Sequence, residues 1–455
     1  MGQVVRLVQK PPLPLLVGRS AGGTIDRWGL RHSVEPGPAL SAFERAVHGT
    51  AAHRPSAGPA LGEALAADRD LVAGHALRGF GALILARSEL VATAHASLAD
   101  ARAALARVGG TGDERALAEA LALAVEGRFR DAAARLEAGL DGNPHAFLLA
   151  KLAHGLRFMV GDAAGMIGTT GRVLDAWDES RPGYGYLLGC HAFALEELGQ
   201  LDAAERIGRR AVALAPDDAW GLHAVGHVHE MQGRTADGIA WLEAARPVWR
   251  ACNNFSFHMA WHLALFHLEE GRADRALSLY DAEVRPQPTD DVRDVANAVS
   301  LLWRLEQEGV PAGERWEELR AVALGRRTDA TWIFAALHNL LALVAVGEDA
   351  AGHDVLRAIE ARACGADDQA ETADEIGCEL AETILDLRRL GAGRGRLELL
   401  AARLPRLGGS HAQRDLFVRI LAECAADRGD AGALAQIKNS RERLKRRDRF
   451  ARRRA

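Results

Sequence analysis

Aromatic residues and long apolar runs are both scarce in this chain of 455 residues. Aromatics make up 5% of the sequence, and Ala, Leu, Arg and Glu dominate it, a composition that favours helices over strands. No apolar run reaches the roughly 18–20 residues that a membrane-spanning helix needs, and prolines interrupt the N-terminal segment LVQKPPLPLLVG. The composition therefore favours a helical protein, built as two or three domains or as one elongated repeat array.

Cysteines are few and isolated. Cys190, Cys252, Cys364, Cys378 and Cys424 are scattered, and no two of them have C-x-x-C spacing. An odd number of isolated cysteines indicates free thiols in a reducing compartment rather than a disulfide framework, so we expect a cytoplasmic protein.

The net charge of −5 is unevenly distributed. Residues 438–455 carry ten Lys and Arg against two acids, which leaves the rest of the chain at about −13. An acidic body argues against a fold built to bind nucleic acid. We expect the tail to be a solvated end, with an electrostatic contact to RNA or to an anionic membrane as the weaker alternative.

Regularly spaced turns determine the predicted architecture. From Leu61 onward apolar residues recur at i, i+3, i+4 and i+7, and strand-type alternation is absent. Turn glycines follow one another at intervals of 34 or 38 residues: Gly127, Gly161, Gly199, Gly233, Gly271, Gly309 and Gly347. A 34-residue period of paired helices is the tetratricopeptide pattern, and four extra residues fit a longer loop or an added turn. The predicted fold class is all-α, a tetratricopeptide-like superhelix in which each glycine ends a first helix in the left-handed conformation.

The same regularity divides the chain into five parts. We expect a disordered leader over residues 1–25, an N-terminal helical cap region over 26–112, tetratricopeptide-like repeats over 113–350, a C-terminal helical cap region over 351–437 and the basic tail over 438–455. Repeat units cannot bury their apolar faces alone, so the units must stack, and the irregular regions are expected to cap the ends.

Histidines cluster in two neighbouring repeats. Six of the 17 fall between residues 223 and 267. His223 and His227 are four residues apart, as are His258 and His262, and this spacing lets two imidazoles on one helix reach a single metal ion. Counted back from the turn glycines, both pairs fall on the helix face that lines the concave groove of a tetratricopeptide array.

The same count assigns faces to the other residues nearby. Glu230 and Trp261 fall in the groove, and His338 falls there two units further on. His229 and His267 fall toward the partner helix, so we interpret them as core residues.

The groove histidines admit more than one chemistry. Two pairs on adjacent helices, with Glu230 beside them, could supply three or four ligands to zinc or a similar divalent ion. A metal-free alternative assigns acid–base catalysis to Glu230, His223 and His258. An incidental pairing of histidines is the third interpretation.

Several long motifs resemble one known family. PDDAWGLHAVGHVHEMQGR, HMAWHLALFHLEEGRADRALSLYD, DRWGL at residues 26–30 and GGSHAQRD at residues 408–415 are similar to the tetratricopeptide repeat protein 38 family, over about residues 26–430. The resemblance implies a helical-repeat fold in the cytosol, and no settled activity. With the motifs included, the candidate ligand-binding residues are His227, Trp261, His262, His338, Gln413, Arg414 and Asp415.

Two functions follow as hypotheses. The first is a binding module whose groove, lined by His, Glu and Trp, holds a peptide, a protein segment or a small ligand. The second is an enzyme, metal-dependent and hydrolase-like, that closes over a small molecule and uses Arg414 to bind an anionic group on it. Neither hypothesis predicts a specific nucleic-acid partner.

Overall fold

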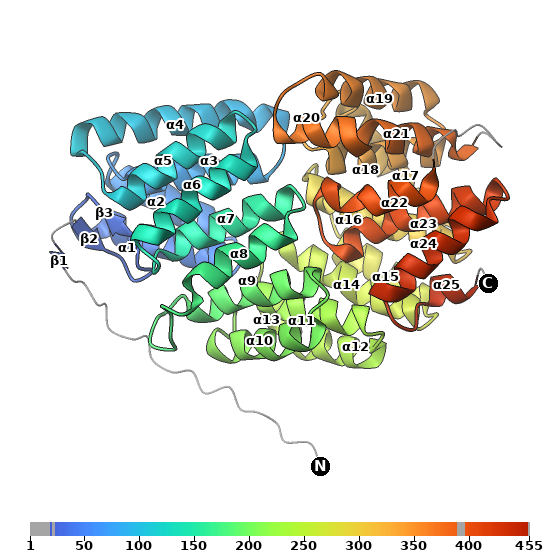
Figure 1. Ribbon diagram of the computed structural model, residues 1–455, viewed down its shortest axis with the longest axis horizontal. Coiled ribbons are helices and arrows are strands. Elements are labelled where there is room, and N and C mark those ends of the chain that lie inside the picture. The colour runs from blue at the N-terminus through green and yellow to red at the C-terminus, as the bar shows by residue number, and fades with distance from the viewer. Residues whose placement is uncertain (1–18, 21–22, 389–395, 454–455) are drawn as a thin grey trace, which may run out of the picture.

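Figure 1 shows the computed structural model, which describes residues 19–20, 23–388 and 396–453. In the described N-terminal region, short strands precede the first helices: β1 Arg19–Ser20, β2 Gly23–Ile25, β3 Arg31–His32, α1 Pro38–Ala51, α2 Ala57–Ala67, α3 Val72–Ile84 and α4 Ser88–Val108. The remainder of the described chain is helical, which confirms the all-α class.

Paired helices fill the middle of the chain. They are α5 Gly112–Val125, α6 Phe129–Gly142, α7 Phe147–Met159, α8 Ala163–Leu174, α9 Tyr184–Glu197, α10 Leu201–Leu214, α11 Ala219–Met231, α12 Thr235–Ala244, α13 Arg246–Trp249, α14 Phe255–Glu269, α15 Ala273–Leu279, η1 Tyr280–Val284, α16 Val292–Gln307, α17 Arg315–Gly325 and α18 Ile333–Val346.

Shorter and less regular helices follow. They are α19 Asp349–Ala363, α20 Asp368–Thr372, η2 Ala373–Gly377, α21 Cys378–Leu385, η3 Asp386–Arg388, α22 Leu397–Arg403, η4 Leu404–Leu407, α23 His411–Asp427, α24 Ala431–Leu444 and α25 Arg449–Arg453. Among the described residues, no helix combines the length and the apolar character that crossing a bilayer requires.

The turn glycines have the predicted conformation. All seven adopt a positive φ, from 64° to 82°, each between the first and second helix of a pair. Glycine is suited to this position because it has no Cβ to clash with the carbonyl of the preceding turn. The longer intervals hold added helical elements, such as α13 between Gly233 and Gly271 and the π-helix η1 between Gly271 and Gly309. The helical-repeat prediction is therefore confirmed.

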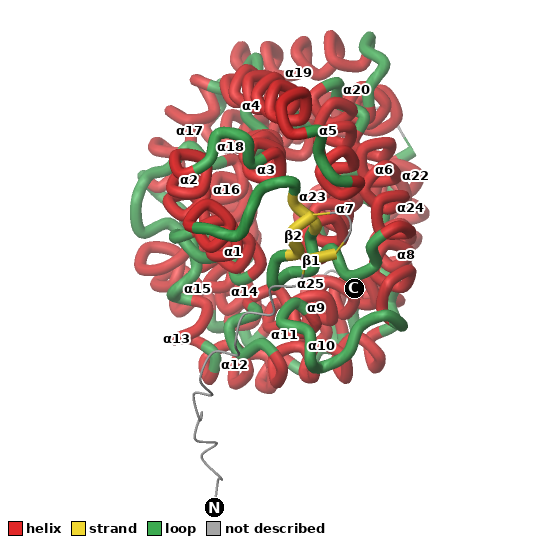
Figure 2. The backbone as a smooth tube through the Cα atoms, turned by 90° about the vertical axis from the view of Figure 1, so that its left-hand side faces the viewer, coloured by secondary structure: helices red, strands yellow, loops and turns green. Residues whose placement is uncertain are grey.

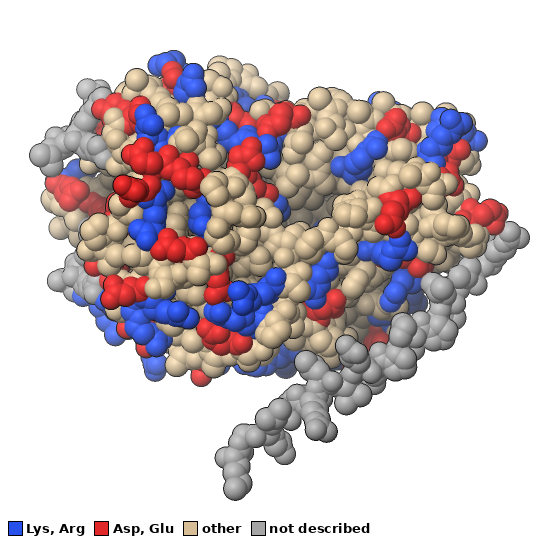
Figure 3. Space-filling view, turned by 180° about the vertical axis from the view of Figure 1, so that it is seen from behind, with Lys and Arg blue, Asp and Glu red and all other residues tan. Residues whose placement is uncertain are grey.

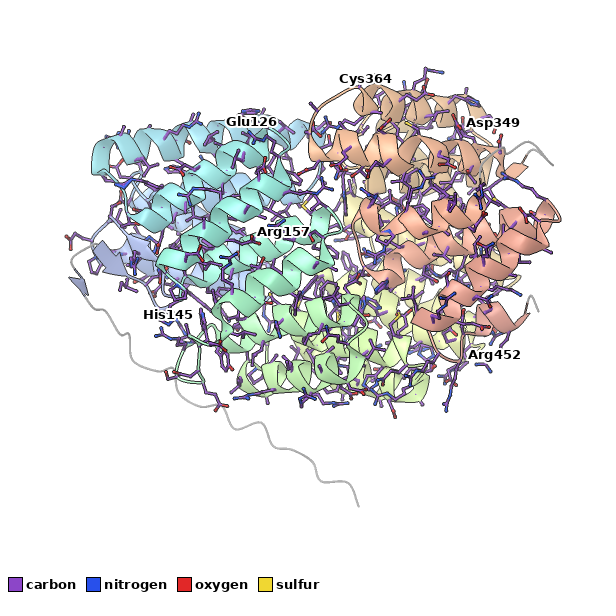
Figure 4. All side chains as sticks on the ribbon, viewed as in Figure 1. Glu126, His145, Arg157, Asp349, Cys364 and Arg452 are labelled. Carbon is purple, nitrogen blue, oxygen red and sulfur yellow. The ribbon has the colours of Figure 1, made fainter. Side chains whose placement is uncertain are left out.

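The superhelix curves until helices of its N-terminal part reach helices from the C-terminal part of the chain. In Figure 1 the cyan helices α4 and α5 lie beside the orange helices α19 and α20 at the top of the molecule. Figure 2, seen from the side, also shows α4 and α19 close together at the top. Arg130 donates to Asp368 at 2.8 Å, and the Ser88 hydroxyl donates to Asp329 at 3.0 Å. Glu126 and Cys364 mark the two sides of this upper edge in Figure 4. These contacts close the array on itself.

The last residues also pack against the repeats. The basic tail, expected to be solvated, continues α24 and forms α25 as far as residue 453, with Lys445 and Arg441 buried. Arg441 pairs with Asp448 and Asp415, and Phe450 joins the core. The expectation of a solvated end is wrong for these residues, because their cations find carboxylate partners in the body of the protein.

The N-terminal leader lies largely outside the described residues. The last residues of this leader are described: Thr24 pairs with His32 and Ile25 with Arg31 in an antiparallel sheet. The Asp26 carboxylate accepts hydrogen bonds from the backbone N–H of Trp28 and Leu30, both at 2.9 Å, and so fixes the turn between the two strands. The predicted disorder is therefore wrong for residues 23–25.

Most of the buried apolar residues form one core, and the charges on the face seen in Figure 3 are mixed. One continuous apolar cluster extends from Trp28 to Phe450. On the face seen in Figure 3, acidic and basic side chains are interspersed, and no large area there carries a single sign. That face does not have the basic surface that nucleic-acid binding requires.

Candidate functional site

The two predicted histidine pairs meet in the interior. α11 carries His223 and His227, and α14 carries His258 and His262. From His223 Nε2, the Nε2 atoms of His227, His258 and His262 lie at 2.9, 3.0 and 3.1 Å. From His262 Nε2, those of His227 and His258 lie at 3.2 and 3.1 Å. Four imidazoles from two adjacent repeats therefore present their Nε2 atoms to one point.

Helix geometry and capping bring the pairs into register. A spacing of four residues places both imidazoles of a pair on the same face of the helix, one turn apart. Asp218 caps α11, since its carboxylate accepts the Trp220 N–H at 3.2 Å. The N-cap of α14, Asn254, makes no side-chain capping bond, but the preceding Asn253 side chain accepts the Phe255 N–H at 3.1 Å. These contacts stabilise the start of each helix and hence the position of its histidines.

The cluster is enclosed, and the open groove expected from the sequence is not what the structure has. His227 and Trp261 are each 0% exposed, and Glu230 is buried as well. The physical reason is the closure described above, which lays helices from both ends of the chain over the concave face. His229 and His267 are also buried.

Hydrogen bonding alone does not account for these contacts. The Nε2 atoms of His223, His227 and His262 lie within 3.2 Å of one another in all three pairings. A ring nitrogen either carries a proton and donates or has a lone pair and accepts, so among three such atoms at least one contact joins two of a kind. A cation bound by the lone pairs removes that conflict. In a tetrahedral zinc site with bonds of about 2.0–2.1 Å, neighbouring ligand atoms lie about 3.3 Å apart.

In three of the four imidazoles, a polar side chain lies close to the other ring nitrogen, Nδ1. Nδ1 of His227 lies 3.3 Å from Glu196 Oε2, and Nδ1 of His262 lies 3.5 Å from Glu230 Oε2. Nδ1 of His258 lies 3.0 Å from Oδ1 of the Asn297 side-chain amide. Only the His258 contact is a hydrogen bond, while the two carboxylates lie at ion-pair distance. An acceptor at Nδ1 favours a proton there and leaves the Nε2 lone pair for a metal ion.

Neither Glu196 nor Asn297 was predicted from the sequence. Glu196 could have been found, because it lies three residues before Gly199 just as Glu230 lies three residues before Gly233. The two glutamates therefore occupy the same repeat position, and each approaches a histidine of the next repeat. Asn297 has no such counterpart in the pattern.

Burial and neighbouring charges set the protonation of the cluster. Burial, followed by the other imidazoles, lowers the pKa of His223 and His258 well below the usual value. Burial and the nearby His227 lower the pKa of His262 to about 4. For His227, burial is outweighed by the Glu196 carboxylate, so its pKa is raised. Three of the four rings are therefore neutral at neutral pH.

Lys445 holds the buried Glu230 carboxylate ionised beside the cluster. Lys445 Nζ lies 3.2 Å from Glu230 and 2.9 Å from Glu269. Burial raises the pKa of Glu230, but Lys445 and His262 outweigh it and hold that pKa well below the usual range. The tail thus provides a counter-charge next to the histidines.

The remaining predicted residues have other surroundings. The Trp261 ring stacks on His258 with centroids 5.2 Å apart, behind the imidazoles. His338 hydrogen-bonds the Phe334 carbonyl at 2.8 Å and packs on Phe417. Neither belongs to the group of converging Nε2 atoms, and Trp261 and His338 stay untested as ligand-binding residues.

The C-terminal motif does not lie open over the histidines. Arg414 is buried and pairs with Glu197 at 2.7 Å, so its guanidinium is committed within the protein. Asp415 pairs with Arg419 at 2.9 Å and with Arg304 at 3.2 Å. The hypothesis that Arg414 binds an anionic substrate group disagrees with this geometry, because Glu197 already neutralises it.

A cavity borders the cluster. It has a volume of about 520 Å³ and lies among α1, α3, α7, α11, α14 and α16, with His223 and His258 in its wall. Gln413 also lines it, while its side chain accepts the Ser410 N–H in a capping box. No sequence pattern predicted this cavity, because its wall combines residues that are far apart in the chain, such as Gly49 and Gln413.

Comparisons with known proteins add little to the site. No protein-family model matches the chain. The structure of Naa15/Naa10 bound to HypK-THB is similar at 15% identity, covering 91% of this chain and 64% of that one, with a TM-score of 0.25. The crystal structure of the P58(IPK) TPR domain is similar at 15% identity, covering 77% and 89%, with a TM-score of 0.21. This chain thus spans about 64% of the length of the first. Similarity at this level says nothing of a shared site or function.

Proposed function

We propose that the protein binds one divalent metal ion of the zinc type through His223, His227, His258 and His262, and that this centre forms the wall of a small-molecule binding cavity. The convergence of the four Nε2 atoms carries the proposal. The acceptors behind three of the rings support it, because an oriented imidazole is what metal sites require. The quoted motifs support membership of the tetratricopeptide repeat protein 38 family, which we include in the proposal.

Four protein ligands favour a role for the ion in organising the fold. Zinc sites that stabilise a fold have four protein ligands, whereas hydrolytic sites keep one position for water. A hydrolytic role for this centre would require one ligand to leave. His258 is the ligand suited to that, since it is only half-buried and lines the cavity.

The cavity favours a small molecule over a protein segment. A volume of about 520 Å³ is within the range of sites for drug-sized molecules. An extended peptide would need a surface that runs along several repeats, and here helices from both ends of the chain cover that surface.

Metal analysis of the purified protein tests the proposal. We expect about one zinc ion per chain, and the strong visible absorption of tetrahedral Co(II) after cobalt exchange. His227→Ala and His262→Ala should lose the metal. His229→Ala and His267→Ala are matched controls, because those histidines are buried in the same two helices but lie outside the cluster, and they should keep it.

A different result would refute the metal centre. Metal content below about 0.1 per chain, with no uptake on dialysis against zinc, would remove it. Equal metal content in the cluster variants and their controls would remove it too.

A further inference from the structure

We propose that the cavity beside the histidines binds a small organic carboxylate with an apolar body, and that Lys151 binds its carboxylate group. The inference deepens the proposed function, in that it rests on the cavity holding a small molecule. It does not depend on the metal ion.

Lys151 is the cation that faces this space. It lies on α7 in the cavity wall, with Nζ 3.7 Å from Cys190 Sγ and 5.3 Å from the centre of the Trp220 ring. Among the described residues Lys151 forms no ion pair, and the buried Asp218 carboxylate interacts with it only beyond ion-pair distance. A thiol and an aromatic face are weak partners for an ammonium group, so Lys151 can take an anion from a ligand.

Other donors in the wall have no acceptor in the described protein. The indole N–H groups of Trp220 and Trp332 are buried without a hydrogen-bond partner, and both rings line the cavity. An indole nitrogen can only donate, so both groups are donors without an acceptor among the described residues. The ring nitrogens of His154, a buried residue of the same wall, are unpartnered as well.

Two other charged residues of the cavity wall already interact with neighbouring protein groups. Asp294 and Arg293 also line the cavity. Asp294 accepts from Asn254 and Thr289, both at 2.7 Å, while Arg293 pairs with Asp291. These two residues are thus engaged with the protein, and Lys151 remains as the cation available to a ligand.

Most of the cavity wall is apolar. It includes Ile84, Leu85, Leu152, Phe158 and Met159. An apolar chain or ring gains stability by leaving water for such a surface, whereas a compact hydrated anion does not. One cation in an apolar cavity therefore fits a molecule with a single carboxylate and an apolar body.

Calorimetric titration of the full chain tests the inference with three probes: decanoate, decan-1-ol and inorganic phosphate. We expect decanoate to bind at least about ten-fold more tightly than decan-1-ol, because only the carboxylate forms a charge-assisted bond with Lys151. Phosphate should not bind measurably, since it has no apolar part. Lys151→Met should weaken decanoate at least about ten-fold and leave decan-1-ol unchanged.

Controls separate the inference from folding and from the metal centre. Lys151→Arg should restore most of the decanoate affinity, and Lys438→Met, outside the cavity, should match the wild type. A His227→Ala/His262→Ala protein should still bind decanoate, whatever its metal content. The inference is overturned if decanoate does not bind, if decan-1-ol or phosphate binds as tightly, or if Lys151→Met leaves decanoate affinity unchanged.

Discussion

Individual acidic side chains determine how well the histidines are oriented. Glu196 and Glu230 hold equivalent repeat positions, and each faces the Nδ1 atom of a histidine one repeat further along. The pairing of an imidazole with a carboxylate fixes both the ring plane and the tautomer. This histidine–carboxylate arrangement occurs twice because the two glutamates hold the same position in consecutive repeats.

Replacing these glutamates should weaken metal binding without removing a ligand. We expect Glu196→Gln and Glu230→Gln each to lower zinc affinity about 10–100-fold, measured by competition with a chromophoric chelator. Glu179→Gln is the control, because Glu179 forms an exposed pair with Arg210. Affinities equal to that of the control would show that the carboxylates do not support the ligands.

Asp218 provides a separate test by pH. Burial raises its pKa to about 7, while an unfolded aspartate ionises near about 4. Between these values only the unfolded chain ionises, so Asp218 lowers the stability of the fold by about 1.4 kcal/mol per pH unit as pH rises from about 4 to about 7. We expect Asp218→Asn to remove this contribution, seen as a smaller loss of unfolding free energy over that range in urea titrations. An unchanged slope would contradict the assignment.

The helix-to-helix turns differ in what surrounds them. Gly161 and Gly199 both have a positive φ, 69° and 73°. A Cβ on Gly161 would lie against the carbonyl oxygen of Pro405, whereas a Cβ on Gly199 would meet nothing within 4 Å. The C-terminal segment therefore uses one turn as a docking point and leaves the other free.

Alanine at the two turns should thus have unequal effects. Gly199→Ala should cost about 1–2 kcal/mol of unfolding free energy, the strain of a left-handed alanine. Gly161→Ala should cost at least about 1 kcal/mol more, because it also displaces the Pro405 backbone. Urea titration of both variants measures the difference. Equal costs would mean that the segment around Pro405 is not packed against the turn.

Sequence patterns predicted the elements better than their assembly. The glycine register located the helix pairs and, through them, the two histidine pairs and Glu230. It could not reveal the closure, because contacts such as Lys445 with Glu230 join residues far apart through single side chains with no periodicity. For the same reason Trp261, assigned to an open groove, is buried, and the cavity around Lys151 was not predicted.

A metal ion held by the four histidines, as proposed, should stabilise the whole molecule. It would link α11 to α14 near the middle of a closed array, so its loss affects both ends. We expect a chelator to lower the melting temperature of the wild type in a single transition, because a ligand of the native state stabilises the whole cooperative unit. The His227→Ala/His262→Ala protein should not respond. An unchanged wild-type melting temperature would contradict this role.

The closure also has a consequence for the order of events during synthesis. All four histidines lie between residues 223 and 262, whereas Lys445, which covers Glu230 behind them, is made 445 − 262 = 183 residues after the last of them. At a translation rate of about 5–20 residues per second, that separation lasts roughly 10–40 s. The emerging chain therefore contains all four imidazoles well before Lys445, which covers Glu230 beside them, has been made.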